Sequence, residues 1–173
     1  MNTPLRHSLQ VLAACCLAAA GFTASAAGTV NVSFVNPEQF SDADRGIQRD
    51  RNLEQLAKHL RALGQRELAD GETLDIRVTD VDLAGRVDPF ALRSGASELR
   101  ILKGAADWPR IQLSYTLQRN GVEVRSADER LADLNYLNAS QWPAYANRPL
   151  SHEKHMLDEW FEARFAPRQV GSR

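Results

Sequence analysis

Cysteine is nearly absent from this chain, and the position of the few cysteines matters more than their number. The two cysteines of the 173 residues are Cys15 and Cys16, which lie inside an apolar run near the N-terminus. If that run is removed as a leader, the remaining chain has no thiol. A disulfide, a cysteine nucleophile and a thiolate metal site are therefore excluded from the remaining chain.

Long apolar runs and an excess of basic residues are missing as well. After the N-terminal run, no stretch of the sequence approaches the ~20 apolar residues that a membrane-spanning helix needs. The formal net charge is −1 at pH 7. Nucleic acids and anionic membrane surfaces attract strongly basic proteins. The sequence therefore predicts no membrane span after the leader and no nucleic-acid partner.

Familiar catalytic motifs are also lacking. The chain contains no G-x-S-x-G nucleophile motif, no phosphate-binding glycine motif and no H-E-x-x-H zinc motif. We predict no cofactor. The sequence leaves the question of enzyme activity open and favours a non-catalytic binding or accessory domain, whose partner is an unidentified protein or small molecule of the cell envelope.

The N-terminus has the features of a secretory signal peptide. Arg6 precedes an apolar block at residues 11–22, and small residues follow at 24–26. This pattern is typical of an export signal with a cleavage site after Ala26. We predict residues 1–26 to be the signal peptide.

The rest of the chain, residues 27–173, is then expected to form one exported domain in the periplasm, with a frayed tail from about residue 167. A second interpretation stays open, because Leu12-Ala13-Ala14-Cys15 resembles a bacterial lipobox. In that case the protein is an outer-membrane lipoprotein anchored through Cys15.

Apolar and polar residues alternate in several short segments, which predicts strands with one face in water. Two longer segments have apolar residues at helical spacing and predict two helices. The first covers residues 47–63, with Gly64 near the C-terminus of that helix, and the second begins at residue 151. Because polar residues occupy one whole face of the strands, both helices are expected on the other face. The predicted strands are 29–35, 74–78, 98–102, 111–118 and 122–125.

These elements predict an α+β fold with two layers. The expected order is β-α-β-β-β-β-α, in which a mixed sheet of about five strands has two helices on one face and solvent on the other. The single helix between the first two strands indicates a parallel pair with a right-handed crossover.

A hairpin is predicted around Asn120-Gly121, a pair typical of a two-residue turn. Such a turn places Arg119 opposite Val122 and Leu117 beside Val124 on one face. Leu131 is out of phase with Val124, so we expect a bulge or break between residues 127 and 129.

The stretch from Thr79 to Gly85 departs from the alternation of the strand before it. Strict continuation would turn Asp80 and Asp82 toward the core, where a carboxylate without a partner costs several kcal/mol. Two arrangements remain open. Either a bulge near Thr79-Asp80 swaps the two faces, or both carboxylates line a polar pocket opposite a cation or an arginine such as Arg110.

The candidate binding residues are therefore Asp80, Asp82 and Arg110. Carboxylates that cap backbone N–H groups at a strand end are the structural alternative. A metal-dependent enzyme that uses Asp80 and Asp82 is the functional alternative, although two carboxylates are too few to specify a divalent cation.

The histidines give a weaker signal. His152 and His155 are spaced i, i+3 at the start of the last helix and could bind a metal with Glu153 or Asp158 nearby. Surface or capping roles are favoured for both, and His59 is expected in solvent. We therefore predict no metal site.

Four blocks of the sequence together resemble a bacterial exported family named domain of unknown function 3016. The resemblance implies an exported bacterial protein with one domain, and it implies no activity, because none is assigned to the family. The blocks are VNVSF and NPEQFSD at 30–42, VTDVDLAG at 78–85, WPRI and SY at 108–115, and LSHEKHMLDEWF at 150–161.

Overall fold

The structure is a computed structural model, and it describes residues 28–87, 100–104, 106–138 and 148–166. The predicted signal peptide with its cleavage site at Ala26, the possible anchor at Cys15 and the tail from residue 167 lie outside the described residues. The elements are β1 (Thr29–Phe34), η1 (Pro37–Gln39), α1 (Gly46–Glu67), β2 (Glu72–Asp82), β3 (Arg86–Val87), β4 (Arg100–Ile101), β5 (Arg110–Arg119), β6 (Val122–Ala132) and α3 (Ser151–Phe165).

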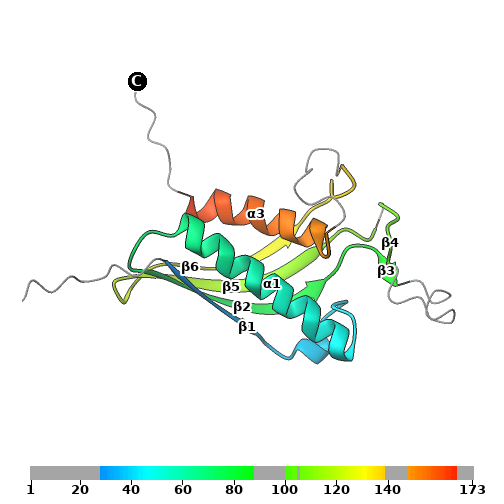
Figure 1. Cartoon of the computed structure of the whole chain (residues 1–173), viewed down its shortest axis with the longest axis horizontal. Helices are drawn as coiled ribbons and strands as arrows, with labels where there is room; N and C mark the ends of the chain where they lie inside the picture. Colours follow the sequence, from blue (N-terminus) through cyan, green and yellow to red (C-terminus); the bar gives the residue numbers. More distant parts are fainter. Residues whose placement is uncertain (1–27, 88–99, 105, 139–147, 167–173) are drawn as a thin grey trace, which may run out of the picture.

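The main sheet is mixed and has four strands in the order β1-β2-β5-β6. β1 and β2 are parallel and are joined through α1, while β2 with β5 and β5 with β6 are antiparallel. Both helices cover one face of this sheet (Figure 1). The predicted α+β class, the two layers and the parallel crossover are thus confirmed.

The strand expected at 98–102 forms as β4, but it does not join the main sheet. β4 pairs with β3 in a separate two-stranded sheet, so the main sheet has four strands and not about five. The reason is a side chain: the Arg100 guanidinium hydrogen-bonds to backbone carbonyl groups at residues 83–85. This contact holds β4 beside the end of β2 and away from either edge of the main sheet.

The hairpin between β5 and β6 corrects a second prediction. Arg119 pairs with Val122 as expected, but the register then shifts, because Leu117 pairs with Arg125 and Gln118 with Glu123. Val124 is the extra residue and is 49% exposed. The bulge therefore lies at Val124 and not at residues 127–129. β6 is an edge strand, where burial does not force an apolar residue to face the core.

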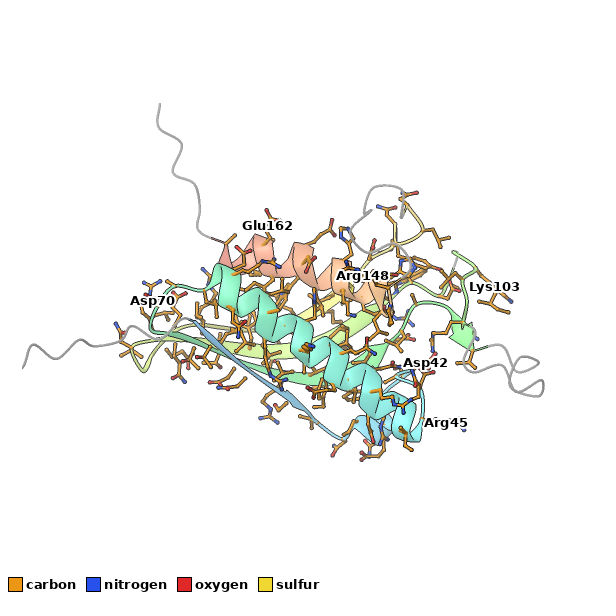
Figure 2. The ribbon with its side chains drawn as sticks, in the orientation of Figure 1. Asp42, Arg45, Asp70, Lys103, Arg148 and Glu162 are labelled. Carbon is orange, nitrogen blue, oxygen red and sulfur yellow. The ribbon has the colours of Figure 1, made fainter. Side chains whose placement is uncertain are left out.

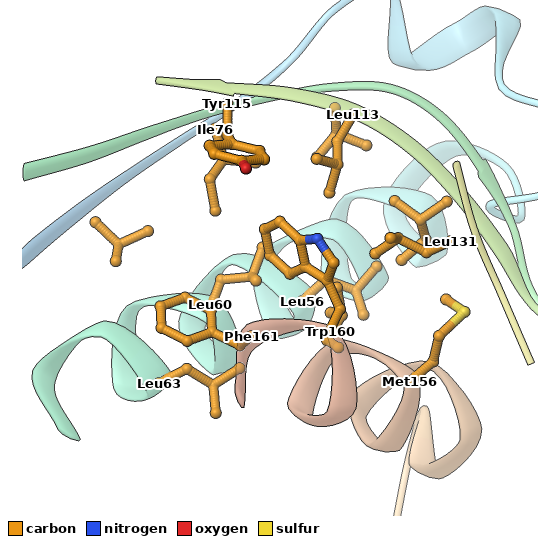
Figure 3. Packing of buried hydrophobic residues seen from close by; sticks show 14 of the residues in the cluster. Leu56, Leu60, Leu63, Ile76, Leu113, Tyr115, Leu131, Met156, Trp160 and Phe161 are labelled. Atoms are coloured by element: carbon orange, nitrogen blue, oxygen red, sulfur yellow. The ribbon is translucent and has the colours of Figure 1, made fainter. Parts of the chain in front are cut away.

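The core lies between the two helices and the sheet (Figure 3). Leu56, Leu60 and Leu63 of α1 and Phe161 of α3 are buried against Ile76 and its neighbours in the sheet. The Trp160 ring packs edge-on against Tyr115, with 5.9 Å between ring centroids. Each large apolar side chain buried in this way contributes about 1.5–3 kcal/mol relative to an exposed one.

Gly64 has a role that differs from the predicted one. α1 continues to Glu67, so Gly64 lies inside the helix and is buried. A Cβ at this position would overlap Val30 Cγ2 of β1. The glycine therefore permits close approach of helix and strand, and it does not end the helix.

Candidate functional site

The faces of β2 exchange at a bulge. Val78 pairs with Leu113 and Asp80 with Gln112, so Thr79 is the extra residue. Val78, Val81 and Leu83 are all buried in the core. Asp80 and Asp82 consequently lie on the face away from the helices. Of the two arrangements left open by the sequence, the structure has the bulge near Thr79-Asp80, and this bulge removes the cost of two carboxylates in the core.

Asp80 binds the segment that follows η1. Its carboxylate accepts hydrogen bonds from the backbone N–H of Ser41 at 2.7 Å and from the Ser41 hydroxyl at 2.8 Å. The next residue continues this docking, because Asp42 N–H donates to the Val81 carbonyl at 3.0 Å and Leu83 N–H donates to the Asp42 carbonyl at 2.8 Å. Asp80 therefore fixes the chain at residues 41–42 along the edge of β2.

Asp82 lies opposite Arg110 on the neighbouring strand. Arg110 donates from Nε to Asp82 Oδ2 at 3.0 Å and also from Nη2 to the same oxygen. The guanidinium carbon lies 5.6 Å from the centroid of the Trp108 ring, and the side chain is 46% exposed. The structure thus brings together Asp82 and Arg110, while Asp80 bonds to Ser41 and, at 3.4 Å, to Gln112.

Arg100 is a central residue that the sequence interpretation missed. Its Nη2 donates to Asp42 Oδ2 at 2.6 Å, and its Nη1 donates to Asp44 Oδ1 at 3.0 Å. The same guanidinium donates to the carbonyl groups of Ala84 at 2.9 Å and Gly85 at 2.9 Å. The available signal was one arginine within a short apolar segment, and it gave no indication of partners more than fifty residues away.

Asp107 and Tyr136 form a second polar unit that was not predicted. The Tyr136 hydroxyl donates to Asp107 Oδ1 at 2.6 Å, and the N–H groups of Lys103 and Gly104 donate to the same carboxylate at 2.7 and 2.9 Å. Burial raises the pKa of Asp107, but these hydrogen bonds outweigh burial and hold the pKa below its ordinary value. Burial and the Asp107 carboxylate raise the pKa of Tyr136 to about 12.

Glu153 connects α3 to the end of β2. It is buried, and its Oε1 accepts a hydrogen bond from the Ala84 N–H at 2.7 Å. Burial raises the pKa of Glu153, against the opposing effects of the Ala84 hydrogen bond and the positive charges nearby. The sequence suggested Glu153 only as a possible neighbour of a metal ion, and in the structure its carboxylate instead links α3 to the end of β2.

The histidine predictions have different outcomes. His59 is not in solvent, because its side chain is 14% exposed and its Nε2 lies 2.6 Å from Asp158 Oδ1 of α3. The helical spacing of the apolar residues placed His59 on the polar side of α1, but α3 packs beside that side. His155 Nε2 lies 3.4 Å from Glu159 Oε1. Within the described residues, no group of three or more His, Cys, Asp or Glu side chains could hold a metal ion.

A cleft of about 890 Å³ lies between the start of α1, the end of β2 and β3, and the residues that line it include Asp42, Asp82 and Asp107. Figure 2 labels Asp42 and Arg45 on the α1 side and Lys103 beside β4. The Arg45 and Arg86 side chains line the cleft and have no hydrogen bond or ion pair to any residue that the structure describes. The charged lining residues are Glu38, Asp42, Asp44, Arg45, Asp82, Arg86, Asp107 and Arg110.

Among the helices that the structure describes, none combines the length and the hydrophobicity needed to cross a bilayer.

Comparison with known proteins places the sequence in one family. No curated protein matches the chain. A crystal structure of a minor lipoprotein from Acinetobacter baumannii is similar at 14% identity and a TM-score of 0.25, and the match covers 81% of this chain and 96% of that chain. A TM-score this low carries no argument about fold or function. The model of the family described as protein of unknown function (DUF3016) matches residues 28–163, and the chain belongs to that family.

Proposed function

We propose that this protein is an exported, non-catalytic binding domain of the cell envelope, and that its ligand is held in the cleft at the end of β2. One observation carries the proposal: Arg45 and Arg86 line the cleft, and neither guanidinium has a partner among the described residues. An arginine presents five N–H donors that suit carboxylate and phosphate groups. The ligand is therefore a polar molecule that carries such an anionic group.

The carboxylates of the cleft support recognition more than catalysis. Asp42 and Asp44 are bound by Arg100, and Asp82 is bound by Arg110. Carboxylates held in this way are rigid acceptors for N–H and O–H groups of a ligand. The Arg110 guanidinium also binds Asp82 Oδ2 and offsets the charge of that carboxylate, which weighs against a metal-dependent enzyme built on Asp80 and Asp82.

Export is the part of the proposal that rests on the sequence, namely on the leader that ends at Ala26. The measurement is the mass of the N-terminal peptide of the protein isolated from its native host. A chain that begins at Ala27 supports the soluble exported form. A diacylated Cys15 supports the anchored form, and an uncleaved Met1 overturns export through this signal.

The ligand class is tested by thermal unfolding in the presence of small carboxylates, phosphates and divalent cations. A ligand present at 100 times its dissociation constant stabilises the folded state by about 2.7 kcal/mol. We expect at least one anion to raise the melting temperature of the wild type. Arg45→Ala and Arg86→Ala should each reduce that shift.

Arg66→Ala is the matched control, because Arg66 is an exposed arginine in the last turn of α1, away from the cleft. It should keep the full shift. If no anion raises the melting temperature, or if the two cleft variants respond like the control, the proposal is wrong. A shift with a divalent cation that is lost in Asp80→Ala and Asp82→Ala would favour the metal-dependent alternative.

A further inference from the structure

β6 is a long edge strand, and this feature is independent of the cleft. It has 11 residues, and the side chains from Val122 to Ser126 are all exposed. Within the described ranges, its one strand partner is β5. The outer edge of such a strand presents N–H and C=O groups that can pair with another strand. The opposite edge is different, because β1 has six residues and the chain returns beside β2 beyond its end.

The bulge at Val124 determines which side chains share a face of β6. From Arg125 onward the pairing with β5 is regular: Arg125 pairs with Leu117 and Glu129 with Leu113, both buried residues of the helix-covered face. Ser126 and Asp128 alternate with these residues and lie on the other face. Opposite charges on β6 are thus separated by four residues on one face, with Ala127 midway between them.

We propose that β6 pairs antiparallel with β6 of a second copy of this chain, about a two-fold axis at Ala127. This arrangement places Arg125 opposite Glu129 of the second copy, and the symmetry makes that pair twice. It also places each Ser126 hydroxyl opposite the Asp128 carboxylate of the second copy. Opposite charges directly across a strand pair contribute about 0.2–1 kcal/mol each. The two sheets then form one continuous sheet.

The adjacent two-fold registers are less favourable, which is the reason for selecting this one. An axis at Ser126 places Arg125 opposite Ala127 of the second copy, so no charges of opposite sign meet across the strand pair. An axis at Asp128 places that carboxylate opposite itself. Like charges directly opposite each other destabilise a strand pair. Among these three registers, the one at Ala127 alone opposes charges of different sign.

Arg125 and Glu129 can make the new contacts without losing their present ones. Arg125 Nη1 donates to the Arg164 carbonyl at 2.5 Å. Glu129 accepts from Arg164 Nε at 2.8 Å and from Trp160 Nε1 at 3.0 Å. A guanidinium has five N–H donors and a carboxylate has about four acceptor sites, so each group keeps capacity. The contacts to α3 also restrict the conformations of both side chains.

The register is tested by crosslinking in the full chain with Cys15→Ser and Cys16→Ser, which leaves no native cysteine. At the proposed axis, the two copies of residue 127 have Cα atoms about 4.5–5.5 Å apart. A disulfide needs about 4.4–6.8 Å. Ala127→Cys should therefore form a covalent dimer under mild oxidation. Glu123→Cys should form no covalent dimer, because the two copies of residue 123 would lie about 26 Å apart at ~3.3 Å per residue.

Equal crosslinking of the two cysteine variants, or none in either, would overturn the register. A second measurement covers the case in which a cysteine at residue 127 disturbs the core. We expect sedimentation of the wild type to show a concentration-dependent dimer. Arg125→Glu places a glutamate opposite Glu129 of the second copy in both pairs, and it should raise the dissociation constant of the dimer at least tenfold.

Arg77→Glu is the matched control, because it makes the same charge change on β2, an inner strand. It should leave the dissociation constant unchanged. A wild type that is monomeric at every concentration reached, or a dimer that tolerates Arg125→Glu as well as Arg77→Glu, contradicts the proposal. A wild type that is always monomeric would favour a strand from a different protein as the partner of the β6 edge.

Discussion

The two halves of β2 are organised by different forces. Before Thr79, Leu74, Ile76 and Val78 point regularly into the core beneath the helices. After the bulge, Asp80 and Asp82 are held on the outer side by Ser41 and Arg110. The first half is stabilised by apolar burial, and the second, in which Val81 is also buried, depends in addition on hydrogen bonds between residues far apart in the sequence. One strand therefore both anchors the core and forms a wall of the polar cleft.

The largest effect is expected in the apolar half. Phe161 of α3 is completely buried in the core, and Phe161→Ala should lower the free energy of unfolding by about 3–5 kcal/mol, through lost burial and the cavity left behind. Urea unfolding followed by circular dichroism measures this loss. Ile47→Ala is the control, because Ile47 is 72% exposed and its truncation should change stability by about 0.5 kcal/mol or less. A similar loss in both variants would show that the helices do not pack as described.

The next effect lies in the polar half, at Arg100. Its side chain is 17% exposed and binds two carboxylates and several carbonyl groups. Arg100→Met keeps a similar length but removes every donor, and it should cost about 2–4 kcal/mol because buried acceptors lose their partners. The urea midpoint gives the loss, with Arg66→Met as the exposed control. If Arg100→Met is as stable as the wild type, the polar half does not depend on this network.

A smaller effect with a distinct pH dependence is expected at Glu153, which connects α3 to the end of β2. Its pKa is raised, so it favours the folded state most when protonated, below the ordinary pKa of a glutamate, and this contribution is lost as the pH rises through the folded-state pKa. Glu153→Gln keeps an oxygen that can accept from the Ala84 N–H. The variant should therefore be at least as stable as the wild type at pH 7.

The advantage of Glu153→Gln should shrink as the pH falls, because the wild-type carboxyl group becomes neutral too. Unfolding curves of the variant and the wild type, recorded at pH 7 and at acidic pH, measure the difference in stability between them and its change with pH. A variant that is less stable than the wild type at pH 7 would mean that the ionised carboxylate stabilises the junction.

The smallest effect is expected at the pair of Asp82 and Arg110. Because Arg110 is 46% exposed, solvent screens the pair, and its coupling should be about 0–1 kcal/mol. A double-mutant cycle with Asp82→Asn and Arg110→Met measures the coupling free energy. A coupling above about 2 kcal/mol would show that this contact supports the fold, and that its role is more than that of a cleft wall.

The fold was predictable where burial decides the pattern. Alternation around Ile76 and the apolar stripes of both helices gave the two layers and the parallel pair. The bulge at Thr79 was also predictable as one of two arrangements, since two carboxylates and two apolar residues cannot all satisfy one strand face without it.

The remaining features depend on contacts that a single sequence does not indicate. Val124 follows the alternation of an inner strand, but the edge position of β6 leaves it exposed. Gly64 resembles a helix terminator until β1 is seen to pack against it. Arg100 binds Asp42 and Asp44 across a long separation in the chain, so the cleft became visible only in three dimensions.

The central claim is that the polar end of β2 is the binding end of the molecule. The most direct test is an NMR titration of the ¹⁵N-labelled protein with whichever anion raises its melting temperature. We predict that the shifted amide signals cluster at residues 37–45, 82–87 and 106–110, and that Arg86→Ala weakens the titration. Shifts confined to the exposed face of the sheet, for example at Asn31, Asp75 and Thr116, would contradict the claim.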